Sequence, residues 1–158
     1  MSKGAFLLAV DPGMKGAIAW RGNGVVGVQK IAVNPADLCL QLGELLAPQP
    51  LKSDFICFLE EVGGYIGKAQ PGSSAFKFGR QVGVIEGVLA AHQIEVRKIR
   101  PQAWQKALSS ISRPGEEKNA HKRRLRALAL ELYPRLREQI TLQTADALLI
   151  LRAGEQSL

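Results

Sequence analysis

The sequence predicts a single α/β domain with a mixed five-stranded sheet, in which three antiparallel strands precede two parallel strands and helices flank the sheet. Short apolar segments separated by tight turns fill the first 31 residues, and two later apolar segments each follow a helical pattern. Strands joined by tight turns pair antiparallel, whereas strands joined through a helix pair in parallel. The length fits one domain with a full core, which we assign to residues 1–158.

The first three strands are expected at residues 5–10, 16–20 and 25–31. An Asp-Pro-Gly turn ends the first of them, and a Gly-Asn-Gly turn between the second and the third is a strong hairpin signal. We therefore expect these strands to pair in sequential order.

The remaining elements follow from changes in the hydrophobic period. A helix from Pro35 has its leucines on one face and is ended by Pro48 and Pro50. Residues 54–59 are apolar on both sides, which is typical of a central strand with helices on both faces. We further expect helices at 73–92, from 101, at 118–132 and at 142–152, a strand at 95–99, and a flexible loop at 109–117.

The chain is basic, with 21 Lys and Arg against 14 Asp and Glu and a net charge of +7. Twelve of the basic residues lie between Arg97 and Arg137, where only three residues are acidic. This distribution suits a polyanion such as nucleic acid, although a surface that is simply solvated gives the same count. Anionic lipid is disfavoured because no strongly hydrophobic helix accompanies the basic run.

The cysteines and the apolar segments predict a cellular location. Cys39 and Cys57 form no CxxC pair and no zinc-binding spacing, so we expect both to be buried, reduced thiols. The N-terminal apolar run is too short for a signal peptide, and no segment is long enough to span a membrane. We therefore expect a cytoplasmic protein without membrane contact.

Three carboxylates occupy positions where stability alone does not explain them. Asp11 ends the first strand, Glu60 ends the central strand, and Asp146 lies in an otherwise apolar helical segment. Each has an ordinary alternative: a turn residue, a solvated strand end, and an acid favoured by a helix dipole. Because side chains alternate along a strand, only one of Glu60 and Glu61 can join Asp11, and we expect it to be Glu60. Together the three could hold hard cations such as Mg²⁺.

Five segments resemble the RuvC-like Holliday-junction resolvases, particularly the small phage-type members, within the RNase H-like superfamily. They are residues 9–19 (AVDPGMKGAIA), 58–89, 99–108, 118–134 and 144–151 (TADALLIL), in the family's order. The second segment, with its Glu, Gly-rich loop and Phe-Lys-Phe-Gly, is the most specific. DPGxxG alone is weak because actin-like sugar kinases begin similarly, but such a kinase needs a far longer chain. The resemblance covers nearly the whole sequence.

The resemblance implies a homodimer that binds a four-way DNA junction and nicks two opposing strands. Its catalytic and metal positions match Asp11, Glu60 and Asp146, which implies two Mg²⁺ ions per site, with Mn²⁺ as a substitute. The match is incomplete because Gln143 stands where bacterial members usually carry another carboxylate. Gln143 either binds metal weakly through its carbonyl oxygen, or DNA phosphate and water replace that ligand.

Other functions of the same residues remain open. A nuclease of flaps, forks or RNA/DNA hybrids could use the same sheet and the same acids. If Gln143 marks a degraded site, the chain would instead bind junctions without cutting them.

We expect DNA contacts in the basic helix and around the Gly-rich loop, at Lys118, Lys122, Arg123, Arg126, Tyr65, Lys68, Lys77 and Arg80. Lys118 matches a lysine of the family and is expected at the cleaved phosphate, the alternative being an exposed helix lysine. Tyr65 would stack on bases opened at the junction centre and Lys68 would bind backbone, unless the loop is simply flexible. His121 is expected to be an ordinary DNA or solvent contact rather than a catalytic base.

Three glycines recur every four residues in the helix expected at 73–92: Gly79, Gly83 and Gly87. This spacing allows a close contact with a second subunit, but close packing on the protein's own sheet would give the same pattern. We expect Phe76 and Phe78, which precede the glycines, to lie mainly in the core.

Overall fold

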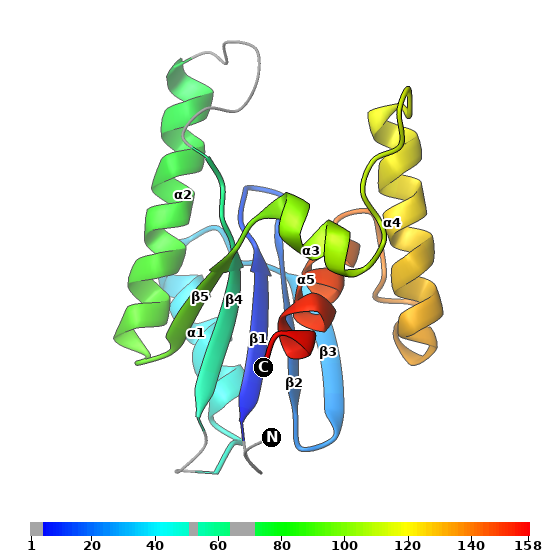
Figure 1. Cartoon of the computed structure of the whole chain (residues 1–158). Helices are drawn as coiled ribbons and strands as arrows, with labels where there is room; N and C mark the ends of the chain where they lie inside the picture. Colours follow the sequence, from blue (N-terminus) through cyan, green and yellow to red (C-terminus); the bar gives the residue numbers. More distant parts are fainter. Residues whose placement is uncertain (1–4, 51–53, 64–71) are drawn as a thin grey trace.

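The computed structural model describes residues 5–50, 54–63 and 72–158. Its five strands form one sheet in the order β3-β2-β1-β4-β5 (Figure 1). They are β1 (Phe6–Asp11), β2 (Ala17–Gly22), β3 (Val25–Lys30), β4 (Phe55–Glu60) and β5 (Glu95–Ile99). The pairs β1–β2 and β2–β3 are antiparallel, whereas β1–β4 and β4–β5 are parallel. This confirms the predicted mixed sheet.

Turn residues set the order of the first three strands. Asn23 and Gly24 have φ values of 50° and 77°, which the turn between β2 and β3 requires and which Asn and Gly adopt at low cost. The central strand β1 pairs on one edge with β2 and on the other with β4, and its residues from Phe6 to Val10 are buried. The side chains on both faces of β1 and β4 are therefore apolar because helices cover both faces of the sheet.

Two helical layers enclose the sheet (Figure 1). The helices are α1 (Pro35–Leu46), α2 (Gly72–Ala91), α3 (Pro101–Ala107), α4 (Lys118–Leu132), the 3₁₀ turn η1 (Pro134–Leu136) and α5 (Ala145–Gln156). On one face, α1 and α2 bury Leu38 and Ile85 against the sheet. On the other face, Trp104 of α3, Leu125 of α4 and most of α5 form a second core. None of the helices among the described residues is both long and apolar enough to cross a bilayer.

The last helix starts later than its hydrophobic pattern predicts, at Ala145 instead of residue 142. The threonines before it bond the backbone in a tight turn. The backbone N–H of Thr141 donates to Oγ1 of Thr144 at 2.9 Å, and this hydroxyl donates to the carbonyl of Gln139 at 2.6 Å. Such side-chain bonds compete with helical hydrogen bonds, so the helix begins only after Thr144.

Two expectations about exposure were wrong, and the loop expected to be flexible makes ordered contacts. Phe76 is 72% exposed on α2, whereas Phe78 is half-buried, and Cys39 is exposed on α1, although Cys57 is buried as expected. The loop at 109–117 is not free of contacts, since Arg124 of α4 donates to the carbonyl of Ile111 at 2.8 Å. For Phe76 and Cys39, the hydrophobic pattern of the sequence did not show which face of α2 or α1 is covered by the rest of the protein.

Replacing Gly154 with alanine is expected to lower the free energy of unfolding by about 1 to 3 kcal/mol, the usual cost of overpacking a core. A Cβ at this position of α5 would lie 2.4 Å from the ring of Phe58 on β4. Gly43→Ala is the matched control, because its Cβ would meet only His92 at 3.9 Å in the middle of α1. The control should be neutral or slightly stabilising. Urea unfolding of both variants measures the difference, and equal stabilities would contradict the expected clash.

Candidate active site

The topology brings the three expected carboxylates to one edge of the sheet. Asp11 is the last residue of β1 and Glu60 is the last residue of β4. These strands are parallel neighbours, with Val10 opposite Leu59, so their carboxyl ends lie side by side. Asp146 is in the first turn of α5, a helix that packs on β1 and β2. The structure thus places together residues that are 49 and 86 positions apart.

Burial and repulsion by neighbouring carboxylates raise the proton affinity of Asp11 and Glu60. The pKa of Asp11 rises to about 8, mainly because the side chain is buried and also because Glu60 and Asp146 lie nearby. Burial likewise raises the pKa of Glu60, against the opposing effects of a hydrogen bond from Trp104 and the charge of Lys122. Carboxylates that share a desolvated site cannot all ionise without nearby positive charge. The arrangement therefore favours a bound cation.

Lys122 supplies one such charge. Its ammonium group reaches from α4 and forms an ion pair with Oδ2 of Asp146. Burial lowers the pKa of Lys122, but the charge and hydrogen bond of Asp146, together with the charges of Asp11 and Glu60, outweigh this effect and raise it. Lys122 was expected to bind DNA; in this structure it also belongs to the carboxylate cluster.

The donor set fits a hard cation, although the side chains are not arranged around one. Asp146 is 7% exposed, and its Oδ1 atom is buried without a hydrogen-bond partner among the described residues. An unsatisfied carboxylate oxygen beside other carboxylates suits Mg²⁺ or Mn²⁺. Within the described ranges, however, no three His, Cys, Asp or Glu side chains converge closely enough to hold a metal ion. Lys122 pairs with the other oxygen of Asp146, Oδ2.

Gln143 lies at the border of the cluster. Its Nε2 donates to the carbonyl of Gly16 at 3.3 Å, which connects the start of α5 with the turn after β1. A carboxylate could not make this bond, since it has no N–H to donate. Metal binding by Gln143 stays a prediction from the sequence. In the structure its side chain makes a hydrogen bond within the protein instead.

The expected DNA-binding residues lie in several places. Lys118 and Arg123 are exposed on α4, and Lys77 and Arg80 are exposed on α2. Arg126 instead donates from Nε to the carbonyl of Ile140 at 3.1 Å, so it has a structural contact. Tyr65 and Lys68 lie outside the described residues.

Lys77 also lines an open hollow of about 460 Å³ beside the carboxylates. Asp11, Lys15 and Phe78 are among its other lining residues. The hollow therefore offers positive charge and an aromatic ring directly next to a carboxylate of the cluster.

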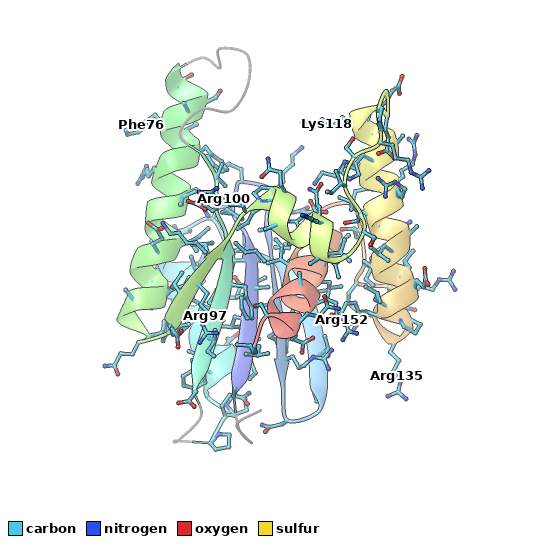
Figure 2. The ribbon with its side chains drawn as sticks, viewed as in Figure 1. Phe76, Arg97, Arg100, Lys118, Arg135 and Arg152 are labelled. Carbon is cyan, nitrogen blue, oxygen red and sulfur yellow. The ribbon has the colours of Figure 1, made fainter. Side chains whose placement is uncertain are left out.

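The basic run of the sequence does not form one patch in space. Figure 2 shows Lys118 at the beginning of α4 and Arg135 beyond its opposite end, with Arg97 and Arg152 also far from Lys118. Only part of the charge excess is therefore near the carboxylates. The N-terminal parts of α2 and α4 stand on either side of the edge where β1 and β4 end (Figure 1).

Sequence reasoning missed two groups of residues around the site. Trp104 donates from Nε1 to Oε1 of Glu60 at 2.8 Å. The position of a tryptophan in a short helix directly after a parallel strand could have indicated a contact at that sheet edge.

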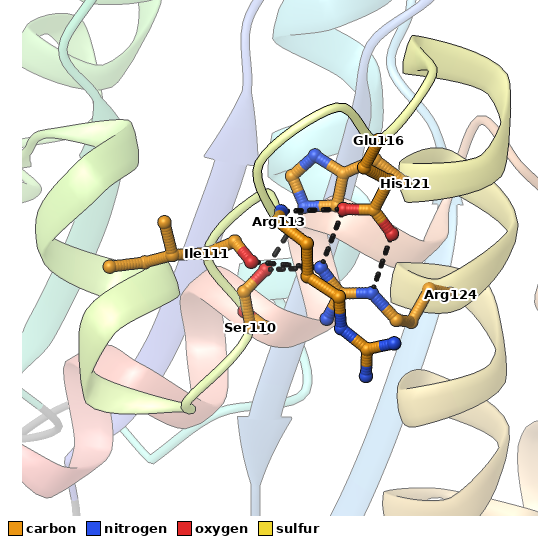
Figure 3. A network of polar contacts seen from close by, with 6 residues as sticks. All are labelled: Ser110, Ile111, Arg113, Glu116, His121 and Arg124. Atoms are coloured by element: carbon orange, nitrogen blue, oxygen red, sulfur yellow. Dashed lines mark hydrogen bonds and ion pairs between the residues drawn. The ribbon is translucent and has the colours of Figure 1, made fainter.

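The second missed group anchors the chain before α4 (Figure 3). Arg124 pairs with Glu116 at 2.9 Å, and the Nε2 atom of His121 lies 3.0 Å from the carbonyl oxygen of Ser110. The hydrogen bond from Arg124 is the main reason why the pKa of Glu116 falls to about 2. The only feature of the sequence that could have indicated this ion pair is the separation of eight residues between Glu116 and Arg124. His121 therefore contacts its own chain, at the carbonyl of Ser110.

Asp11→Asn is expected to stabilise the metal-free protein at pH 8. Above the ordinary aspartate pKa of 3.8, Asp11 is ionised in the unfolded chain, whereas the folded protein keeps it protonated up to about pH 8. The folded state then binds more protons, so the stability of the wild type falls as the pH rises through this window. Asparagine removes this contribution.

Urea unfolding in EDTA between pH 5 and pH 8 measures this effect. The advantage of the Asp11→Asn variant over the wild type should grow with pH. Asp37→Asn removes an exposed aspartate in the first turn of α1 and is the control for loss of a carboxylate; it should gain no stability over the wild type as the pH rises. An Asp11→Asn curve that runs parallel to the wild type would contradict the raised pKa.

Neither a protein-family model nor a curated protein sequence matches this chain. Solved structures do match it. One is Thermus thermophilus RuvC in complex with a Holliday junction substrate, with a TM-score of 0.62 and 14% identity over 95% of this chain and 92% of that chain. Another is Thermus thermophilus RuvC, with a TM-score of 0.55 and 14% identity over 95% and 93%. The chain therefore has the predicted RuvC-like, RNase H-like fold.

Proposed function

We propose that this protein is a metal-dependent endodeoxyribonuclease that resolves four-way DNA junctions by paired nicks. The observation that carries the proposal is that Asp11, Glu60 and Asp146 lie at one edge of the sheet, near enough for their charges to raise the pKa values of Asp11 and Glu60. The fold similarity to a RuvC protein bound to a Holliday junction supports the choice of substrate. Membership of the small phage-type group and a cytoplasmic location stay predictions from the sequence.

In this proposal the three carboxylates hold Mg²⁺, or Mn²⁺ in its place, with two ions per site. When bound, such ions supply an activated water and stabilise the oxygen that leaves the phosphodiester. Lys122 is held beside the carboxylates, where its ammonium can donate to an oxygen of the cleaved phosphate. Lys118 and Arg123 on α4, and Lys77 and Arg80 on α2, then bind the DNA backbone on either side.

We further propose that two copies associate through α2. Gly79, Gly83 and Gly87 are exposed, and a Cβ at each would meet nothing within 4 Å. Packing on the protein's own sheet is therefore not the reason for their spacing. Phe76 extends the same stripe and points outward in Figure 2. An aromatic side chain beside a glycine face suits a close contact with an identical helix.

Gly83→Arg tests this interface by filling the stripe with a long charged side chain. Light scattering after size-exclusion chromatography should show a dimer for the wild type and a monomer for the variant. Leu40→Arg is the control, because Leu40 is a 67% exposed apolar residue on α1. A wild-type monomer, or a variant that stays dimeric, would count against the α2 interface.

The function is tested by nicking of a mobile four-way junction beside a linear duplex, a flap and an RNA/DNA hybrid, in Mg²⁺, Mn²⁺ and EDTA. The proposal requires paired, symmetric nicks in the junction alone, which EDTA abolishes. Equal cutting of the flap or the hybrid would indicate a broader structure-selective nuclease. Tight junction binding without cutting in either metal would indicate a binding protein, in which Gln143 marks a degraded site.

A further inference from the structure

One oxygen of Glu60 is held by a buried tryptophan. The indole Nε1 of Trp104 donates to Oε1 of Glu60 at 2.8 Å, and Trp104 is only 1% exposed. Among the described residues, no other side chain or backbone group donates to the Glu60 carboxylate. The indole N–H has no alternative role, because it can only donate and would be unsatisfied in the core without this acceptor.

The chain builds this contact through strand register. Glu60 is opposite Ile99, so β4 and β5 end at the same level, and the backbone N–H of Glu61 donates to the carbonyl of Ile99 at 2.8 Å. Pro101 then opens α3, and one turn later Trp104 returns to the end of β4. The indole packs in the same core cluster as Phe58 of β4 and Ala145 of α5. Trp104 is thus fixed against β4 and α5, the two elements that hold Glu60 and Asp146.

We propose that Trp104 is a positioning residue, which orients the Glu60 carboxylate so that its Oε2 atom is presented to a divalent cation. This inference rests on the proposed function, since it assumes that Glu60 is a metal ligand. A carboxylate with one oxygen tied to a rigid, buried donor loses rotational freedom before the cation binds. Outer hydrogen bonds of this kind typically contribute about 10-fold to 100-fold to metal affinity.

A purely structural role for Trp104 makes a different prediction. If the indole only filled the core, its loss would lower the stability of the protein but leave the metal affinity of the folded protein unchanged. The two roles therefore separate in a binding measurement on folded, DNA-free protein, without any need for cleavage activity.

The experiment is a Mn²⁺ titration followed by the electron paramagnetic resonance signal of the free ion, for the wild type, Trp104→Phe and Trp20→Phe. Trp104→Phe removes the N–H donor and keeps an aromatic ring. Trp20→Phe makes the same chemical change on β2, where the ring packs against Gly27. We expect the Mn²⁺ dissociation constant of Trp104→Phe to rise about 10-fold or more, and that of Trp20→Phe to stay within about twofold of the wild type.

A second variant is needed in case Trp104→Phe does not fold. In the Trp20→Phe background, Trp104 is the only tryptophan and can be replaced by benzothienylalanine, which has the ring shape of tryptophan with sulfur in place of the N–H. The same weakening of Mn²⁺ binding, with little loss of stability, would support the positioning role.

The possible failures are distinguishable. Wild-type Mn²⁺ affinity in both folded variants would overturn the role of Trp104 and leave the proposed function intact. A wild type that does not bind Mn²⁺ would overturn the metal site, and the role of Trp104 with it. If the wild type binds Mn²⁺ but does not cut junctions, the proposed activity fails, and the comparison of the variants still decides the role of Trp104.

Discussion

Asp146→Asn is expected to reduce junction nicking by at least about a thousandfold while junction binding is retained. The substitution keeps the shape of the side chain but removes the charge at the buried start of α5. Bound metal ions lower the barrier of phosphodiester hydrolysis by several kcal/mol. Loss of about 4 kcal/mol corresponds to about a thousandfold in rate. The measurement is the single-turnover rate of nicking, with junction affinity determined in parallel.

Asp37→Asn is the matched control for this result. Asp37 also lies in the first turn of a helix, but α1 is on the opposite face of the sheet from α5, and Asp37 is exposed. It should therefore lose only the small effect of an acid at a helix N-terminus and keep the wild-type rate. Nicking by Asp146→Asn at the wild-type rate would remove Asp146 from the active site. Loss of junction binding together with nicking would instead indicate a folding defect.

Gly16→Ala is expected to lower the free energy of unfolding by about 3 kcal/mol, the upper part of the usual range for overpacking, and to abolish nicking. A Cβ at Gly16 would lie 2.0 Å from the backbone oxygen of Asp11, which cannot move like the end of a flexible side chain. The backbone N–H of Gly16 also donates to Gly13 at 3.2 Å, and its carbonyl accepts from Ile31 at 3.2 Å. The turn must therefore open and displace Asp11.

Urea unfolding and the nicking assay together test this second prediction. Met14→Ala is the control within the same turn, because the Met14 side chain is 54% exposed. It should change the stability by less than about 0.5 kcal/mol. A Gly16→Ala protein with wild-type stability and activity would show that the turn adapts without moving the carboxylate.

Local sequence patterns were sufficient to predict the sheet and the carboxylate cluster. The turn at Asn23 and Gly24 indicated a hairpin, and the apolar run before Glu60 indicated a central strand. Once β1 and β4 are parallel neighbours, the positions of Asp11 and Glu60 at the ends of their strands bring them to the same edge. This part of the site follows from strand direction alone, which a single sequence can indicate.

Contacts between distant elements could not be predicted in the same way. The ion pair of Lys122 with Asp146 depends on how closely α4 approaches α5, and the contact of Trp104 with Glu60 depends on the path of the chain after β5. The exposure of Phe76 depends on which face of α2 the sheet covers. The periodicity of apolar residues identifies a helix or strand and its apolar face, but it does not show how closely two such elements pack against each other.

The ion pair between Lys122 and Asp146 has a consequence for the order of binding events. In the proposed function, a cation competes with the ammonium for the charge of the same carboxylate, so the free protein would bind metal less tightly than the carboxylates alone. A DNA phosphate that draws Lys122 away removes this competition. The proposal therefore implies that metal and DNA binding are thermodynamically linked, so that each would increase the affinity for the other by the same factor. The protein would gain its metal mainly where its substrate is already present.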